Sequence, residues 1–400
     1  MTFKSQNFEK ANHFLMILLG FMMPLTVAGG NIILLLIVFL WILSGNILQK
    51  IKEISINPLI KISWIFYLTF LLGLIWTDDI QWGFLMLKKM IDFGVFLPIL
   101  MSVSKTEHIK YYIAAFLSSI ALTVFLSYGI WFELIPEFHN ATKLNPTVTM
   151  SHISYNPFLA FAAYITLHQV FLGNEKRTIW VVGYFLLFLL IGFNMFITGG
   201  RAGQLMFFVT LAIISIQYFG IASKKNIFVI FLIPIIFVSA LIFNDNFHKR
   251  IFDGLNNFSS FYQENKFDTS VGERLFYFNT SLDIFRNNPL FGVGTGDFPE
   301  EFKKERDKRY PMGPLTVNPH NMYLLILSTL GLFGLIPFLM IFFSQLKIAN
   351  KNKGIYKNLG ITLPIFFTFL MIFDSYLLGH FTTMLFIYFS AFLYKNIAKN

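Results

Sequence analysis

His320 belongs to a polar segment, 318–321, that runs directly into a long apolar stretch ending near Phe343. A stretch of this length can cross a bilayer, so the histidine should lie at a membrane surface. If Asn318 caps the helix and Pro319 takes its first position, His320 lies in the first turn, near free backbone N–H groups. The helix dipole there favours the neutral imidazole that a general base requires. The alternative is a histidine that only anchors a helix at the headgroup level.

Two arginines have surroundings that suit recognition of an anionic group. Arg201 stands between two apolar runs in the turn 198–201, whose glycines let the backbone approach a ligand closely. Arg274 opens a predicted helix over 273–286, and two guanidinium groups would neutralise most of the charge of a diphosphate. The alternatives are snorkelling or a helix N-terminal contact for Arg201, and an ordinary surface position for Arg274.

Charged residues near the apolar runs form a second set of candidates. Lys88 and Lys89, with Asp92, lie within an apolar run. Ionisable groups are costly there and indicate a function, unless the helix lies at the interface before it enters the membrane. Asp78 and Asp79 could hold a divalent cation, although capping of a helix end is the commoner role of such a pair.

Several other signals are weaker. Asp374 and His380 flank the last outer turn and could either shape a site or cap helices. The run 292–296 lacks the preceding strand and the spacing of a dinucleotide-binding fingerprint, so we interpret it as a turn. Gly331 and Pro337, inside the long apolar stretch after His320, indicate close packing and a kink.

The composition places these residues in a membrane protein. Of the 400 residues, 56% are hydrophobic, 18% aromatic and 13% charged, which excludes an ordinary soluble globular domain. In such a protein the net charge of +10 reflects loop orientation rather than nucleic-acid binding. Because the chain has no cysteine, disulfides, thiolate metal ligands and a cysteine nucleophile are excluded. The sequence predicts no cofactor.

The apolar runs predict an all-α integral membrane protein. At about 20 residues for each span, they use up nearly the whole chain. We therefore predict a single polytopic domain, 1–400, in which one large loop, 244–319, separates the ninth and tenth runs. The twelve runs lie at 13–29, 31–48, 59–76, 83–102, 110–132, 156–173, 178–197, 203–221, 226–243, 321–346, 356–373 and 377–394.

Basic residues predict the orientation of these spans. With the N-terminus in the cytoplasm, most lysines and arginines of the short loops lie on the cytoplasmic side, as the positive-inside rule requires. The first run, preceded by Lys4 and Lys10, is then an uncleaved membrane helix, and both termini are cytoplasmic. The turn 198–201, the loop 244–319 and the start of the tenth run all face outward, so an outward-facing site is predicted.

The large loop carries helical patterns of its own. Apolar residues recur every three or four positions over 273–286, which lines one helix face suited to the lipid interface. They are Leu275, Phe278, Leu282 and Phe285. The sequence Asn-Asn-Pro at 287–289 ends this helix, and the charged segment 300–310 is a further helix or loop.

Three segments taken together resemble the O-antigen ligase and polymerase superfamily. They are TGGRAGQL at 198–205, RLFYFNTSLDIFRNNPLFGVGTGDF at 274–298 and HNMYLLILSTLGLFGL at 320–335. In that superfamily an arginine turn between spans precedes a large periplasmic loop, whose arginine-led helix ends in a Pro-x-x-Gly-x-Gly turn, and His-Asn begins the next span. The motifs cover roughly 190–380. One departure is Thr-Gly-Gly before Arg201, where Ser-x-Ser is common, which puts a hydroxyl contact in doubt.

The resemblance implies a fold and an activity. The fold would be an all-helical, C-type glycosyltransferase in the bacterial inner membrane, with its active site facing the periplasm. The activity would be metal-independent, inverting transfer of a glycan from an undecaprenyl diphosphate carrier. In a ligase the acceptor would be a sugar hydroxyl of lipid A core, and in a polymerase another carrier-linked repeat unit. Donor, acceptor and membrane lipids are therefore the expected partners, with no nucleic acid.

The resemblance also implies site residues. By position, Arg201 and Arg274 correspond to the diphosphate-binding arginines of the superfamily, and His320 to its catalytic histidine. Further substrate contacts are expected from Asn321, Tyr323, Lys88 and Lys89. A protein-glycosylating transferase of the same kind is usually longer. A polysaccharide or lipid-linked glycan transporter is the alternative from another class, although the chain shows neither paired halves nor interrupted helices in matching positions.

Overall fold

The computed structural model describes residues 3–138, 141–175, 177–243, 245–264, 267–309, 311–378 and 380–395. Over these ranges the chain is helical and forms no β-strand, which confirms the predicted all-α fold. The helices are α1 (Phe3–Met22), α2 (Val27–Leu43), α3 (Ile47–Ile54), α4 (Pro58–Leu72), α5 (Ile80–Ile91), α6 (Leu97–Val103), α7 (Ile109–Trp131), α8 (His152–Phe171), α9 (Thr178–Ile197), α10 (Arg201–Phe219), α11 (Lys224–Phe243), α12 (Asp245–Glu264), α13 (Ser270–Asn287), α14 (Phe298–Arg309), α15 (Met322–Lys351), α16 (Lys357–Leu370) and α17 (His380–Leu393).

Every predicted apolar run overlaps helical structure, although the first run contains the turn between α1 and α2 and the second contains the bend between α2 and α3. The fourth run is divided into α5, a π-helix (Asp92–Phe96) and α6. Within the described ranges, four helices are long and apolar enough to cross a membrane: α7 with the 3-10 helix before it (Thr106–His108), α9, α10 and α15. The pair α2 and α3, bent by 114°, would make a fifth, and α4, α16 and α17 are apolar but shorter. The chain is thus a multi-pass membrane protein, whereas a count of twelve spans stays a prediction.

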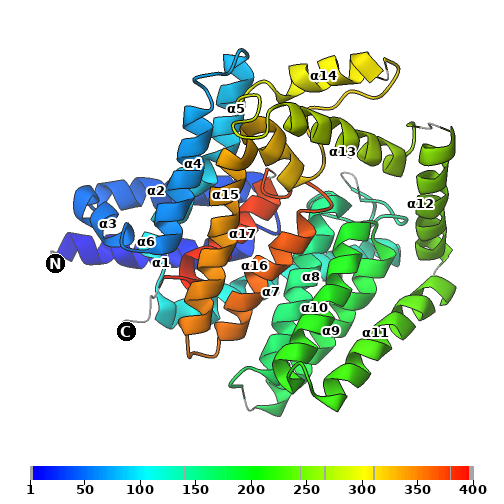
Figure 1. Ribbon diagram of the computed structural model, residues 1–400. Coiled ribbons are helices and arrows are strands. Elements are labelled where there is room, and N and C mark those ends of the chain that lie inside the picture. The colour runs from blue at the N-terminus through cyan, green and yellow to red at the C-terminus, as the bar shows by residue number, and fades with distance from the viewer. Residues whose placement is uncertain are drawn as a thin grey trace.

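The helices around α8 and those around α15 meet where α8 and α10 contact α16. Figure 1 shows α8, α9, α10 and α11 side by side, and α15 between α4 and α16. Residues 155–168 of α8 are all buried. By contrast, large apolar side chains on α9 are exposed, including Ile179 (76%) and Phe193 (54%). Apolar surface of this kind is unfavourable in water and suits contact with lipid.

The large loop is folded as α12, α13 and α14. Figure 1 shows α13 and α14 lying across one end of the helical bundle, with α13 in contact with α15. The helix predicted over 273–286 is confirmed as α13, and the segment 300–310 falls largely in α14. Helix α13 turns Phe276, Tyr277 and Ile284 inward. Of the predicted apolar stripe, Phe278 is 42% exposed, whereas Leu275, Leu282 and Phe285 are partly buried. Helix α12 was not expected, because polar residues dominate its sequence.

A break in α15 at Gly331 is the docking point for the turn that follows α13. Gly331 has φ +61° and ψ −152°, which interrupts the helix. The N–H of Leu332 donates to the carbonyl of Pro289 at 3.0 Å. In the other direction, the N–H of Gly294 donates to the carbonyl of Thr329 at 2.9 Å. The kink predicted from Gly331 is confirmed, and the glycine-rich run is a turn that fills the break.

Asp297 fastens the same turn to the loop between α4 and α5. Its carboxylate accepts hydrogen bonds from the backbone N–H of Asp78, at 3.0 and 2.9 Å, and of Asp79, at 2.8 Å. The side chain of Asp79 caps α5 by accepting from the N–H of Trp82 at 2.9 Å. Of the two roles considered for Asp78 and Asp79, helix capping is confirmed for Asp79.

Gly331→Ala should destabilise the protein by about 2 kcal/mol or more. The alanine would have to adopt a left-handed backbone conformation, and its methyl group would clash with a neighbouring residue. A Cβ at Gly331 would lie 2.5 Å from the carbonyl of Leu290. Thermal unfolding of the purified protein in detergent measures this loss. Gly183→Ala is the matched control, since nothing lies within 4 Å of a Cβ there. Equal melting temperatures for the Gly331 variant and wild type would show that the break is not required.

Candidate functional site

His320 lies in the loop before α15, with a strained backbone. Its φ of +52° is in the left-handed region, which is uncommon for a residue with a side chain and often marks a functional site. Asn318 holds this conformation, because its Oδ1 accepts the N–H of His320 at 3.1 Å and the hydroxyl of Ser375 at 2.7 Å. The loop before α15 is therefore tied to the loop between α16 and α17.

The helix cap of α15 is Asn321, not Asn318. The backbone of Asn321 is extended, and its Oδ1 accepts from the N–H of Leu324 at 3.1 Å. The prediction that His320 lies in the first helical turn is therefore wrong. Asn318 cannot cap this helix because its side chain is used on the loop itself. A neighbouring side chain orients the imidazole.

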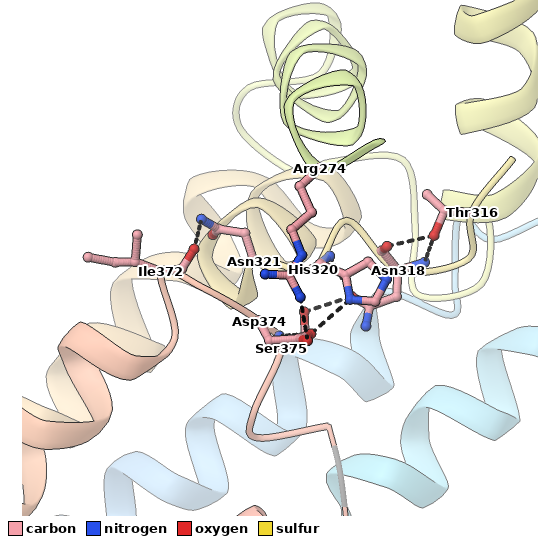
Figure 2. A network of polar contacts seen from close by, with 8 residues as sticks. All are labelled: Arg274, Thr316, Asn318, His320, Asn321, Ile372, Asp374 and Ser375. Atoms are coloured by element: carbon pink, nitrogen blue, oxygen red, sulfur yellow. Dashed lines mark hydrogen bonds and ion pairs between the residues drawn. The ribbon is translucent and has the colours of Figure 1, made fainter. Parts of the chain in front are cut away.

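That neighbour is the carboxylate of Asp374. Nδ1 of His320 lies 3.0 Å from Oδ1 of Asp374 (Figure 2). Burial by itself would raise the pKa of Asp374, but the hydrogen bonds with His320 and the N–H of Ser375, and the charge of Arg274, lower this pKa overall. An ionised carboxylate only accepts hydrogen bonds, so Nδ1 carries the hydrogen, and Nε2 has a lone pair whenever the imidazole is neutral.

Helix α13 brings two more side chains to this carboxylate and imidazole. Nη2 of Arg274 lies 3.9 Å from Oδ2 of Asp374, and Figure 2 shows the guanidinium reaching down from α13 toward it. Tyr277, one turn further along α13, stacks on the ring of His320 with centroids 5.9 Å apart. The Arg274 side chain is 44% exposed, so it can reach a ligand as well as Asp374.

Arg201 is the first residue of α10 and follows a tightly held turn. Gly200 has φ +123°, a conformation that favours glycine. The hydroxyl of Thr198 is buried and donates to Oδ1 of Asn156 at 3.0 Å. The N–H of Gly199 donates to the side chain of Asn145 at 3.1 Å. The Thr198 hydroxyl thus serves to fix the turn, and the turn fixes the start of α10.

Arg201 and Arg274 line the same cavity, of about 240 Å³. His152 and Tyr376 line it as well. Burial raises the pKa of Tyr376, so its phenol keeps its proton and can donate to an anion. We call this space the cationic cavity. Three predicted residues from distant parts of the chain therefore lie close together. The two arginines line one cavity, and both His320 and Arg274 contact Asp374.

The other predicted substrate contacts are not part of this cluster among the described residues. The amide of Asn321 donates to the carbonyl of residue 372 at 3.0 Å, so both its ends are used inside the protein. The hydroxyl of Tyr323 donates to the carbonyl of residue 368 at 2.7 Å. Lys88 is exposed on α5, and Lys89 lies over the ring of Trp82 at 5.8 Å. These residues position helices or face outward in this structure.

Sequence reasoning left the role of Asp374 open, although this residue is the centre of the cluster. The available signal was its position in the last outer turn, on the same predicted side as His320. Nothing local in the sequence showed that it would face a histidine 54 positions earlier in the chain. The side chain of His380, the other residue considered there, lies outside the part of the chain that the structure describes.

Asp374→Asn should remove part of the acid sensitivity of folding. Because the folded pKa of Asp374 lies below its ordinary value of 3.8, the ionised group stabilises the fold above that pH. This contribution is lost as the pH falls through the folded pKa. The melting temperature of wild type should therefore drop more steeply below about pH 4 than that of the variant. Glu300→Gln, which changes an exposed acidic residue, is the control. If the melting temperatures of wild type and the Asp374 variant fall equally with pH, Asp374 does not stabilise the fold as an ionised group.

Residues 185–339 match a family model described as "O-Antigen ligase". This region runs from α9 into α15 and contains Arg201, Arg274 and His320. The chain is also similar to an uncharacterized protein of Haemophilus influenzae (strain ATCC 51907 / DSM 11121 / KW20 / Rd). The two are 26% identical over 316 residues, which cover 76% of this chain and 75% of that protein.

Proposed function

We propose that this chain, a member of the O-antigen ligase and polymerase superfamily, moves a glycan from undecaprenyl diphosphate to a sugar hydroxyl of lipid A core. The observation that carries the proposal is the convergence of His320, Arg274 and Arg201 on Asp374 and the cationic cavity. Paired guanidinium groups suit a diphosphate leaving group, and a histidine with a lone pair suits a hydroxyl nucleophile.

In the proposed reaction, the acceptor oxygen attacks the anomeric carbon while the bond from that carbon to the diphosphate oxygen breaks. Nε2 of His320 takes the hydroxyl proton, and the bonding electron pair leaves with the diphosphate. Asp374 holds the Nδ1 hydrogen and so keeps Nε2 directed at the acceptor. Because no enzyme nucleophile intervenes, this single displacement inverts the anomeric configuration.

Arg201 and Arg274 would stabilise the charge that develops on the diphosphate. The phenol of Tyr376 adds a neutral donor to the same cavity. Donors and charges that are already in place, in a site partly shielded from water, stabilise a transition state without reorganisation. Arg274 would then contact both Asp374 and the substrate. The diphosphate leaving group would therefore lie close to the general base, His320.

Analysis of lipopolysaccharide from a strain lacking the chain tests this assignment against the polymerase. The family model matched by residues 185–339 favours the ligase. Loss of a ligase leaves full-length polymer on the carrier and core without it. Loss of a polymerase leaves core that carries single repeat units, and that result would overturn the ligase assignment.

We further propose that the chain, as a single polytopic domain over 1–400, lies in the inner membrane with both termini in the cytoplasm. The loop 244–319 and the His320 site would then face the periplasm. Helices α13 and α14 lie at the end of the bundle where α15 begins, and the link from α15 to α16 lies at the other end (Figure 1).

Labelling of single cysteines measures this orientation, since the chain has no cysteine of its own. Lys303→Cys, exposed on α14, should react with a membrane-impermeant maleimide in intact cells. Lys353→Cys, exposed between α15 and α16, should react only after the inner membrane is opened. The opposite labelling pattern would refute the periplasmic site.

A further inference from the structure

Three helices begin at the cationic cavity. The first residues of α8 (His152 and Ile153), of α10 (Arg201 and Ala202) and of α13 (Ser270) all line it. Among the described residues, no side chain caps the start of α8 or of α10. Backbone N–H groups at a helix start point out of the helix, and the helix dipole places partial positive charge there. The cavity therefore suits an anion through its backbone as well as through its arginines.

Asn145, in the loop before α8, connects two of these helix starts. Its side-chain carbonyl oxygen accepts the N–H of Gly199 at 3.1 Å, in the turn that leads into α10. Its amide nitrogen lies 3.4 Å from Nδ1 of His152. Reversing the amide would turn its N–H groups toward the N–H of Gly199, where no hydrogen bond could form. The contact with Gly199 therefore fixes the NH2 end of Asn145 toward His152.

This amide decides where His152 carries its hydrogen. An NH2 group only donates, so Nδ1 of His152 accepts and has no hydrogen of its own. In the neutral ring, the hydrogen is then on Nε2. A doubly protonated ring would turn an N–H toward the N–H of Asn145, so the contact disfavours the cation. The tautomer is the reverse of that of His320, whose Nδ1 carries the hydrogen toward Asp374.

We propose that Nε2–H of His152 donates a hydrogen bond to the diphosphate in the cationic cavity, and that Asn145 holds His152 in this neutral form. The inference rests on the proposed function and adds a binding residue to it. The guanidinium groups of Arg201 and Arg274 match the one negative charge on each phosphate of the bound donor. When the bond to the anomeric carbon breaks, the diphosphate gains a further charge. A neutral donor stabilises that charge without adding a third cation that would hold the product.

Binding of inorganic pyrophosphate to two amide variants tests the inference, in purified protein in nanodiscs with empty nanodiscs subtracted. The amide nitrogen of glutamine can reach the position of Nε2, whereas that of asparagine reaches only the position of Nδ1. His152→Gln should bind pyrophosphate within about threefold of wild type, and His152→Asn about tenfold more weakly, as expected for loss of one hydrogen bond to a charged group. His108→Asn, in the 3-10 helix before α7, is the control and should bind like wild type.

¹⁵N NMR of protein labelled at its histidine nitrogens measures the tautomer itself. The chain has 8 histidines, and the signals missing from the His152→Gln variant are those of His152. We expect a hydrogen on Nε2 and none on Nδ1. A hydrogen on Nδ1 would overturn the inference, as would equal pyrophosphate affinities for the glutamine and asparagine variants. A wild type that does not bind pyrophosphate would instead overturn the cationic cavity, and with it the proposed function.

Discussion

His320→Ala should reduce glycan transfer by roughly 10²- to 10⁴-fold, the usual contribution of a positioned general base. The variant keeps the cationic cavity, so donor binding should change little while turnover falls. Initial rates with purified protein, carrier-linked glycan and core acceptor measure this effect. The reason is geometric: Asp374 holds Nδ1 of His320, which leaves Nε2 on the other side of the ring for the acceptor proton.

His108→Gln is the matched control, because this histidine lies in the 3-10 helix before α7 and takes no part in the cluster. It should retain wild-type transfer. Full transfer by the His320→Ala variant would show that another group takes the acceptor proton. A loss in both variants would indicate a general effect on folding rather than on proton transfer.

Arg274→Ala should lower transfer by roughly 10²- to 10³-fold, as expected when one preorganised electrostatic donor is removed. The guanidinium contacts Asp374 and lines the cavity with Arg201, so its loss affects both the leaving group and the carboxylate behind the base. Arg274→Lys should recover only part of the activity, because an ammonium group cannot bind a diphosphate through a planar fork. Rates and inorganic pyrophosphate affinity should fall together.

The same helix supplies the control for this prediction. Arg286, three turns further along α13, is 65% exposed and pairs with Asp283. Surface pairs of this type contribute little, so Arg286→Ala should retain nearly full transfer. Equal losses for the Arg274 and Arg286 variants would mean that the loop needs positive charge in general. The specific role of Arg274 would then be contradicted.

The sequence pattern located the helices well because hydrophobic length and periodicity are local properties. The run predicted at 178–197 coincides with α9, and the arginine-led segment forms α13. Helix α12 was missed since its polar residues dilute the apolar pattern. The number of membrane crossings does not follow from apolar runs alone, because α5 and α6 divide one run and several apolar helices are short.

The site was only partly predictable for a different reason. Residue types and spacing pointed to His320, Arg201 and Arg274. The predicted cap of α15 was wrong because the side chain of Asn318 accepts a hydrogen bond from Ser375, in a segment far away in the chain. The central role of Asp374 depends on the same long-range packing. Local patterns show which residues can do chemistry, whereas tertiary contacts decide which of them meet.

A reconstituted assay that counts products tests the central claim most directly. Purified protein in liposomes would receive carrier-linked glycan and core acceptor, with free undecaprenyl diphosphate and new glycosidic bonds measured together. We predict one released diphosphate carrier for each bond formed, with inverted anomeric configuration at the new linkage. Glycan that crosses the bilayer still attached to its carrier, with no bond formed, would contradict the account and identify a transporter instead.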